Sequence, residues 1–172
     1  MGCLPIIFLD IDGVLNKHVF NREANSNDID KECVKHFNSI LRETEARYVV
    51  SSAWRYMIHN GWMTAKGFEY LLQTHGVMAG RFLGITDTDT MVDIGDGTRQ
   101  PSENERGFQI VQWLIRNNLW LVSKVIAIDD LGTPGTSGEL MGIEAAKVPL
   151  VRTKSNRGLT SADVKRAIKM LS

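Results

Sequence analysis

Short continuous apolar runs alternate along the chain with longer stretches in which apolar residues recur every three or four positions. The continuous runs predict five strands, at residues 6–9, 48–50, 81–86, 124–128 and 148–151. The helical spacing predicts helices at residues 28–45, 64–75, 102–118 and 160–171. Strands that alternate with helices form parallel sheets covered on both faces, so the pattern predicts an α/β fold with a five-stranded parallel sheet.

Polar residues mark the expected starts of three helices. We expect Asn27 or Asp28 to cap the first helix, because such side chains accept hydrogen bonds from the free N–H groups of a first turn. Residues 102–105 have the sequence of a capping box, and Thr160 with Asp163 forms a second capping pair before the last helix.

Two stretches show neither kind of periodicity. Residues 16–27 are polar and are expected to form a loop or small flap. Residues 87–101 carry several aspartates but lack the glycine and final glutamate of an EF-hand calcium loop, so they predict a solvated acidic loop or a second small flap. No linker divides the chain, and we expect a single domain over residues 1–172.

Composition narrows the class of protein. Twenty basic and twenty acidic residues give a formal net charge of zero, which argues against binding to nucleic acid or membrane by bulk electrostatics. Cys3 and Cys33 lack the spacing of a metal or redox pair, which favours a reducing compartment. No apolar run could span a bilayer and no signal-peptide pattern is present, so we expect a cytoplasmic protein without membrane contact.

Acidic and hydroxyl residues follow three of the predicted strands directly. Asp10 and Asp12 end the first strand, Ser51 and Ser52 follow the second, and Asp129 with Asp130 ends the fourth. Side chains two apart on a strand leave the same face, so the first two acids point together. Because ligands bind where strand order reverses, we predict the sheet order 5-4-1-2-3, with a site between strands one and four.

Phosphoryl transfer accounts for this set of side chains. Asp10 with Asp129 and Asp130, together with the carbonyl of Ile11 or Asp12, could hold Mg²⁺, a hard cation that prefers oxygen ligands. Asp10 would then attack phosphorus to form an aspartyl-phosphate. Asp12 would act as general acid and base, Ser51 would donate to a phosphoryl oxygen, and a basic residue would complete the neutralisation of charge.

The same positions resemble the motifs of a known superfamily. The run Ile6 to Val14, with its Asp-x-Asp-Gly-Val ending, resembles motif I of the haloacid dehalogenase (HAD) superfamily, whose members are mostly phosphatases and phosphotransferases. Residues 49–51 resemble motif II and residues 127–130 motif IV. The resemblance implies a Rossmann-like three-layer α/β/α sandwich, Mg²⁺ as cofactor, and Asp130 as the direct metal ligand with Asp129 close behind.

Motif III of that superfamily is usually a lysine near the start of a helix. The best match here is Arg106, with Lys124 and Lys66 as alternatives and an ordinary surface arginine as the competing explanation. Ser52 is included with Ser51 among the expected phosphate-binding residues. Arg55, four residues after Ser51, is expected either to contact substrate or to lie on a helix surface.

A narrower resemblance involves residues 51–55, residues 105–114, and residues 149–151 with 158–160, which are similar to compact HAD domains associated with RNA repair. No segment is long enough for a lid domain, so the resemblance implies no or minimal cap domain and a large phosphorylated substrate, such as a macromolecule or nucleic-acid end. A phosphomonoesterase is the first hypothesis. A nucleic-acid end phosphatase or nucleotidase, and a non-catalytic binding protein, remain as alternatives. The four tryptophans are expected to pack in the core rather than stack on bases.

Overall fold

The computed structural model describes residues 4–17, 28–86, 91–93, 99–101, 106–119, 124–130 and 147–172. Its main sheet contains five strands, in the order β3 (Phe82–Ile85), β2 (Arg47–Val50), β1 (Ile6–Leu9), β6 (Val125–Asp129) and β7 (Leu150–Arg152). Every neighbouring pair in this sheet is parallel. The predicted order 5-4-1-2-3 is therefore confirmed, and β1 lies at the centre.

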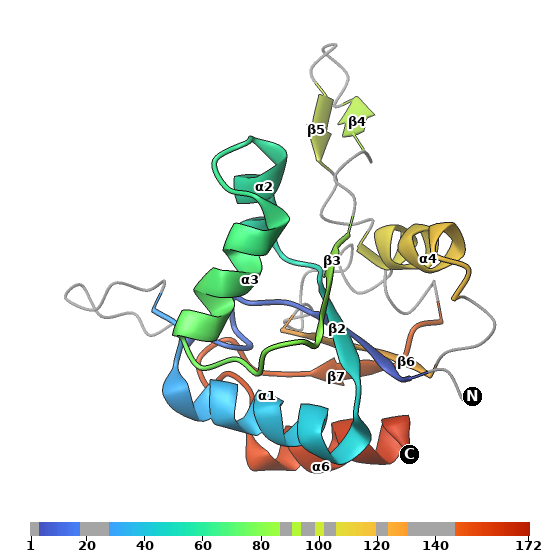
Figure 1. The fold of residues 1–172 in the computed structure, drawn as a ribbon. Helices are drawn as coiled ribbons and strands as arrows, with labels where there is room; N and C mark the ends of the chain where they lie inside the picture. Colours follow the sequence, from blue (N-terminus) through green and yellow to red (C-terminus); the bar gives the residue numbers. More distant parts are fainter. Residues whose placement is uncertain are drawn as a thin grey trace.

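Helices cover both faces of the sheet. Helices α1 (Lys31–Thr44) and α6 (Ser161–Leu171) lie side by side on one face, and α4 (Arg106–Arg116) lies on the opposite face (Figure 1). The side chains of β1 alternate accordingly: Ile7 and Leu9 pack with α1 and α6, whereas Ile6 and Phe8 pack with α4. This burial on both faces explains the uninterrupted apolar run, and it confirms the predicted α/β/α layers.

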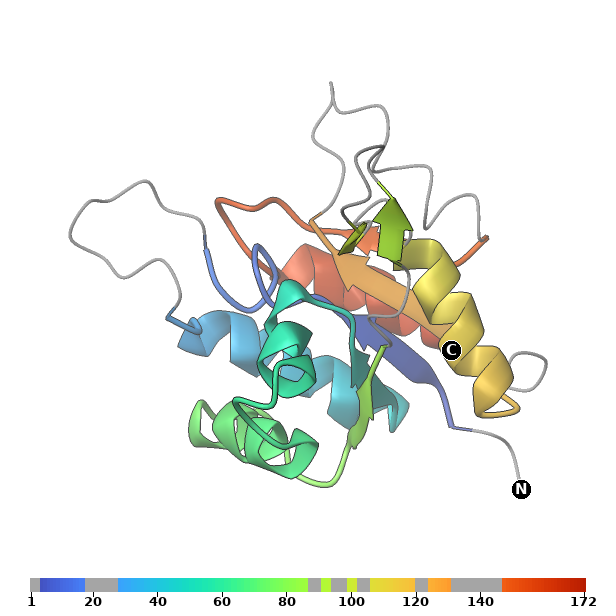
Figure 2. The ribbon, with the colours of Figure 1, turned by 90° about the horizontal axis from the view of Figure 1, so that it is seen from above.

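Three short elements connect β2 to β3. They are the 3₁₀ helix η1 (Ala53–Arg55), α2 (Tyr56–His59) and α3 (Ala65–Thr74). Phe68 and Leu72 of α3 belong to the same apolar cluster as α1 and α6, so α3 extends the layer on that face. In the view from above, α3 (green) and α4 (yellow) lie on opposite sides of the central strand β1 (Figure 2). No helix in the described ranges is both long and apolar enough to cross a membrane.

The cap of α1 differs from the sequence prediction. Asp30, rather than Asn27 or Asp28, caps this helix, and its side chain accepts hydrogen bonds from the N–H groups of Glu32 and Cys33. Asp30 has extended backbone geometry because its own N–H is tied to the Leu15 carbonyl at 2.8 Å. Asn27 lies outside the described residues. Tertiary anchoring of the entering chain therefore selects the cap from several suitable residues.

The other predicted capping signals have different outcomes. Thr160 and Asp163 form the predicted capping box at the start of α6, with both reciprocal hydrogen bonds present. The sequence 102–105 lies outside the described residues, although the helix that it precedes is present from Arg106. Of the four tryptophans, Trp113 packs edge-on against Phe8 and Trp54 packs against the main apolar cluster, as predicted. Trp120 lies outside the described residues, and Trp62 is 76% exposed, so the prediction that it packs is wrong.

Part of residues 87–101, which the sequence predicted to be an irregular loop, forms two short strands. Strands β4 (Met91–Asp93) and β5 (Arg99–Pro101) form an antiparallel pair, with Met91 opposite Pro101. Figure 1 shows this pair beyond the end of β3, away from α1 and α6. Strands of three residues are too short to establish an alternating pattern, which is why the sequence did not reveal them. The remaining residues of 87–101, and most of the flap expected at 16–27, lie outside the described residues.

Burial of Cys33 on the inner face of α1 predicts alkaline destabilisation. Burial, reinforced by the negative charge of Asp30, raises the pKa of the Cys33 thiol from 9.0 to about 11. Between these values the unfolded thiol ionises while the folded thiol stays protonated, so the free energy of unfolding falls as the pH rises. We expect the Cys33 thiol to account for a loss of about 2 kcal/mol between pH 8 and pH 10.5, measured by urea unfolding as the difference between the wild type and Cys33→Ala.

The variant Cys33→Ala should lose less stability than the wild type over the same interval, because it has no thiol to ionise. Burial also raises the pKa of Tyr48, so a smaller decline should remain in the variant. Equal declines in the two proteins would contradict the assignment to Cys33.

Candidate active site

Three aspartates meet at the carboxyl edge of the sheet. Asp10 follows β1, and Asp129 and Asp130 lie at the end of the adjacent β6, where Leu9 pairs with Ile128. One carboxylate oxygen from each of the three lies within 4.8 Å of the other two. Asp10 and Asp129 are only 5% and 2% exposed. The topology thus brings together acids that are far apart in the sequence, within reach of a single ion.

Arg106 lies against two of these acids. Its Nη1 is 3.0 Å from Oδ2 of Asp10 and 2.5 Å from Oδ2 of Asp129. The side chain is buried, so the alternative of an ordinary surface arginine is wrong. Burial alone lowers the pKa of the Arg106 guanidinium, but Asp129 and Asp10 raise it by more, and the net shift is upward. The guanidinium therefore remains a fixed positive charge in contact with the acid cluster.

The composition of this cluster fits a divalent cation. Three carboxylates and one guanidinium leave two net negative charges, and crowded carboxylates of this kind repel each other unless they are neutralised. A few carboxylates, one backbone carbonyl and water are the ligands that Mg²⁺ prefers. The Ile11 carbonyl already accepts N–H groups from Val14, Leu15 and Asn16, which favours the Asp12 carbonyl as the backbone ligand.

Asp12 is held by side chains that the sequence did not assign to the site. The Trp54 indole Nε1 lies 3.1 Å from both carboxylate oxygens of Asp12, and Asn16 Nδ2 lies 2.7 Å from Oδ1. Asn16 in turn accepts the Gly13 N–H at 2.8 Å. The sequence did offer a signal, because Asn16 lies in the turn after the acids and Trp54 follows the strand-end serines. Their contact with one carboxylate was nonetheless visible only in the structure.

Gly13 allows the turn after β1 to approach Asp130. Its φ is +68°, and a Cβ built on it would collide with Asp130 Oδ2. Thr153, which follows β7, donates its hydroxyl to the Gly13 carbonyl at 2.8 Å. A close approach of this kind leaves no room for a side chain, so the glycine is required both by its φ and by its neighbour.

Gly13→Ala is expected to displace Asp130 and to reduce any activity of the site strongly. The positive φ should cost about 1 kcal/mol, and the collision with Asp130 adds to this cost. Gly61→Ala is a matched control, because Gly61 has a φ of +72° and a Cβ added to it would meet no atom within 4 Å. Urea unfolding and phosphatase assays on both variants would measure the difference. A Gly13 variant that behaves like the Gly61 variant would contradict the role of this contact.

The two serines after β2 have different environments. Ser51 is buried, and its backbone N–H donates to the Leu9 carbonyl at 2.8 Å, which fixes it beside β1. Its hydroxyl has no hydrogen-bond partner among the described residues, so it is able to donate to a ligand. Ser52 instead caps η1, where its hydroxyl accepts the Trp54 backbone N–H. Of the two predicted phosphate-binding hydroxyls, Ser51 is therefore the better placed.

Arg55 connects η1 to α4. Its guanidinium donates to the Ser52 carbonyl at 2.8 Å and to Gln109 Oε1 at 3.1 Å, and the side chain is 3% exposed. The alternative of a helix-surface arginine is wrong, whereas the predicted contact with substrate stays a prediction. In the described structure the residue supports the segment that carries Ser52 and Trp54.

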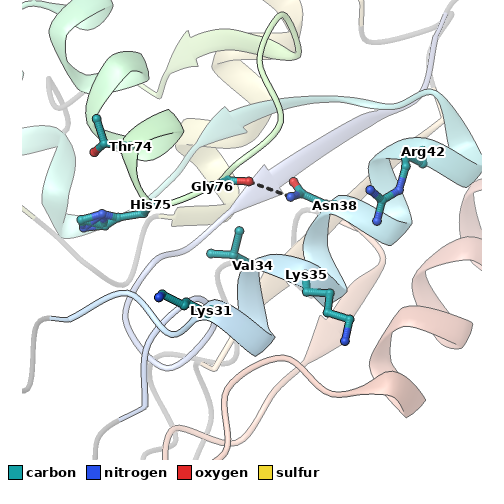
Figure 3. A pocket seen from close by; sticks show the side chains of 8 residues that line it. All are labelled: Lys31, Val34, Lys35, Asn38, Arg42, Thr74, His75 and Gly76. Atoms are coloured by element: carbon teal, nitrogen blue, oxygen red, sulfur yellow. Dashed lines mark hydrogen bonds between the residues drawn. The ribbon is translucent and has the colours of Figure 1, made fainter.

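A cavity of about 390 Å³ lies elsewhere, between α1 and the end of α3. Figure 3 shows its lining, which includes Lys31, Lys35 and Arg42 from α1 and His75 beyond α3. None of the acids at the carboxyl edge lines this cavity. The cavity is therefore separate from the acid cluster, which has the chemistry of a candidate active site.

The fold and these side chains together define a domain of the HAD superfamily, in which a parallel sheet carries paired aspartates after its central strands. A family model described as "HAD domain in Swiss Army Knife RNA repair proteins" matches residues 6–164, so the chain belongs to that family. No curated protein and no solved structure matches the chain. Membership supports a HAD-type phosphohydrolase, and the three clustered aspartates could bind a metal ion.

Proposed function

We propose that this protein is a Mg²⁺-dependent phosphomonoesterase that forms an aspartyl-phosphate on Asp10. The observation that supports the proposal is the cluster of three carboxylates within 4.8 Å around a buried arginine, at the carboxyl edge of a parallel sheet. A dianionic phosphate cannot approach such acids unless their charge is balanced. Asp10, Asp129, Asp130 and the Asp12 carbonyl would hold Mg²⁺, which when bound supplies that balance.

The chemistry then follows from the positions of the remaining side chains. An Asp10 carboxylate oxygen attacks phosphorus, the bond from phosphorus to the ester oxygen breaks, and Asp12 gives its proton to the departing alkoxide. In the second step Asp12 takes a proton from water, whose oxygen attacks phosphorus and releases inorganic phosphate and free Asp10. The Ser51 hydroxyl and Nε of Arg106, both buried and without partners among the described residues, would donate to phosphoryl oxygens.

The substrate that fits best is a phosphorylated RNA end. The family is named for RNA repair, and the described chain between β1 and β2 holds a turn and the single helix α1 rather than a folded lid. A site without a lid cannot enclose a sugar phosphate and exclude water, so specificity must come from the bulk of the substrate. We further propose that residues 1–172 form a single domain and that the protein is cytoplasmic.

We expect a phosphate-release assay to show faster turnover of 3′- or 5′-phosphoryl oligoribonucleotides than of free sugar phosphates. Activity should disappear with EDTA and return with added Mg²⁺. A kcat/KM of about 10⁶ M⁻¹s⁻¹ or more for a small phosphometabolite would contradict the proposal of an open site. Binding of oligonucleotide without release of phosphate would instead favour the non-catalytic alternative.

A further inference from the structure

Two side chains donate hydrogen bonds to the carboxylate of Asp12, and its two oxygens accept different numbers of them. Among the described residues, Oδ1 accepts from both Asn16 Nδ2 and the Trp54 indole, whereas Oδ2 accepts from the indole alone. A carboxylate oxygen has two lone-pair sites, so Oδ2 retains the greater capacity for a further bond. We infer that Trp54 is a positioning residue that holds Asp12 with Oδ2 as the oxygen that transfers the proton. This inference rests on the proposed function.

The indole is a rigid donor because η1 is fixed at both sides. Ser52 caps the start of this short helix, and Arg55 ties its end to the Ser52 carbonyl and to Gln109 of α4. The ring of Trp54 also packs against the main apolar cluster. The side chain therefore cannot follow Asp12 if that carboxylate rotates, and the hydrogen bonds favour one orientation of the acid.

A tryptophan has chemical properties that suit this role. Its indole nitrogen donates one hydrogen bond and accepts none, so it can orient a carboxylate without taking the proton that the carboxylate must transfer. A histidine in the same place could exchange protons with Asp12. Trp54→Phe removes the donor and keeps a smaller aromatic ring for packing, so the test needs a control for the lost volume.

The first test compares esters with good and poor leaving groups through kcat/KM, which reports the step in which the leaving group departs. An alkyl phosphate needs the proton from Asp12, whereas p-nitrophenyl phosphate releases a stable phenolate that needs it little. Trp54→Phe should lower kcat/KM for the alkyl ester about 10- to 100-fold, which corresponds to the free energy of a hydrogen bond to a charged group. For the nitrophenyl ester, kcat/KM should fall by less than about 3-fold. An equal loss on both esters, or a gain on either, would overturn the inference.

A double-mutant cycle separates positioning from general support of the fold. In an Asp12→Asn background, Trp54→Phe should cause less than about a 2-fold further loss, because the residue acts only through the acid. Additive losses would overturn the inference. The matched control is Trp113→Phe, because Trp113 belongs to α4 and packs on Phe8. This control should change kcat/KM for both esters by the same factor.

A measurement without turnover tests the hydrogen bonds separately from the proposed function, and it can be made even if the protein hydrolyses neither small ester. The Trp54 indole N–H signal, assigned by its loss in Trp54→Phe, should move upfield and exchange faster with solvent in Asp12→Ala. An indole signal that is unchanged by Asp12→Ala would show that the hydrogen bonds are absent, and the positioning role would be excluded.

Discussion

Replacing Asp10 by asparagine is expected to abolish phosphate release while leaving the fold intact. An amide is a poor nucleophile toward phosphorus and a weaker ligand for Mg²⁺, so the substitution removes both contributions of this residue. Asparagine has nearly the same shape, and its carbonyl oxygen can still accept the Ile11 N–H that Asp10 Oδ1 accepts at 2.8 Å. Single-turnover assays should detect no phosphorylated enzyme in the variant.

The matched control is Asp163→Asn, which changes another buried aspartate of this chain in the same way. Asp163 belongs to the capping box of α6 and is separate from the acid cluster. This variant should lose about 1 kcal/mol of stability, as expected for a weakened helix cap, and should keep its activity. Near-normal turnover by Asp10→Asn would exclude the covalent mechanism, whatever the behaviour of the control.

Replacing Arg106 by methionine is expected to lower the free energy of unfolding by about 3–5 kcal/mol, because it leaves two buried carboxylates without their cation. Activity should fall as well, since the charge next to Asp10 is lost. Added Mg²⁺ should restore part of the stability, because a divalent cation bound by the same carboxylates offsets their repulsion. Urea unfolding with EDTA and with Mg²⁺ would measure both effects.

Two further substitutions define what Arg106 contributes. Arg106→Lys should recover much of the stability, because a single nitrogen of Arg106 contacts both carboxylates and an ammonium group can do the same. Arg166→Met removes an exposed arginine that pairs with Asp163, and should cost less than about 1 kcal/mol. If Arg106→Met were as mild as Arg166→Met, the ion pairs at the acid cluster would not stabilise the protein as we describe.

Much of the fold could be predicted from the sequence. Burial on both faces makes a parallel strand continuously apolar, and this signal correctly indicated β1, β2 and β6 with boundary errors of at most one residue. The rule that ligands bind where strand order reverses placed β1 between β2 and β6. The sequence also indicated which acids follow the strands, because strand ends are local features. These conclusions depend only on periodicity and on general rules of topology.

The details of the candidate site were decided by tertiary structure. Trp54 and Asp12 are 42 residues apart and Arg106 and Asp129 are 23 apart, and no periodic signal connects either pair. Selection of Asp30 as the cap of α1 depended on how Leu15 anchors the entering chain. Hydrophobic patterns report which residues are buried and in which element, whereas contacts among loops depend on where strand ends meet in space. Periodicity and the residues at strand ends thus predict the sheet and its acidic edge, whereas the side chains that hold those acids in place depend on how distant loops meet in space.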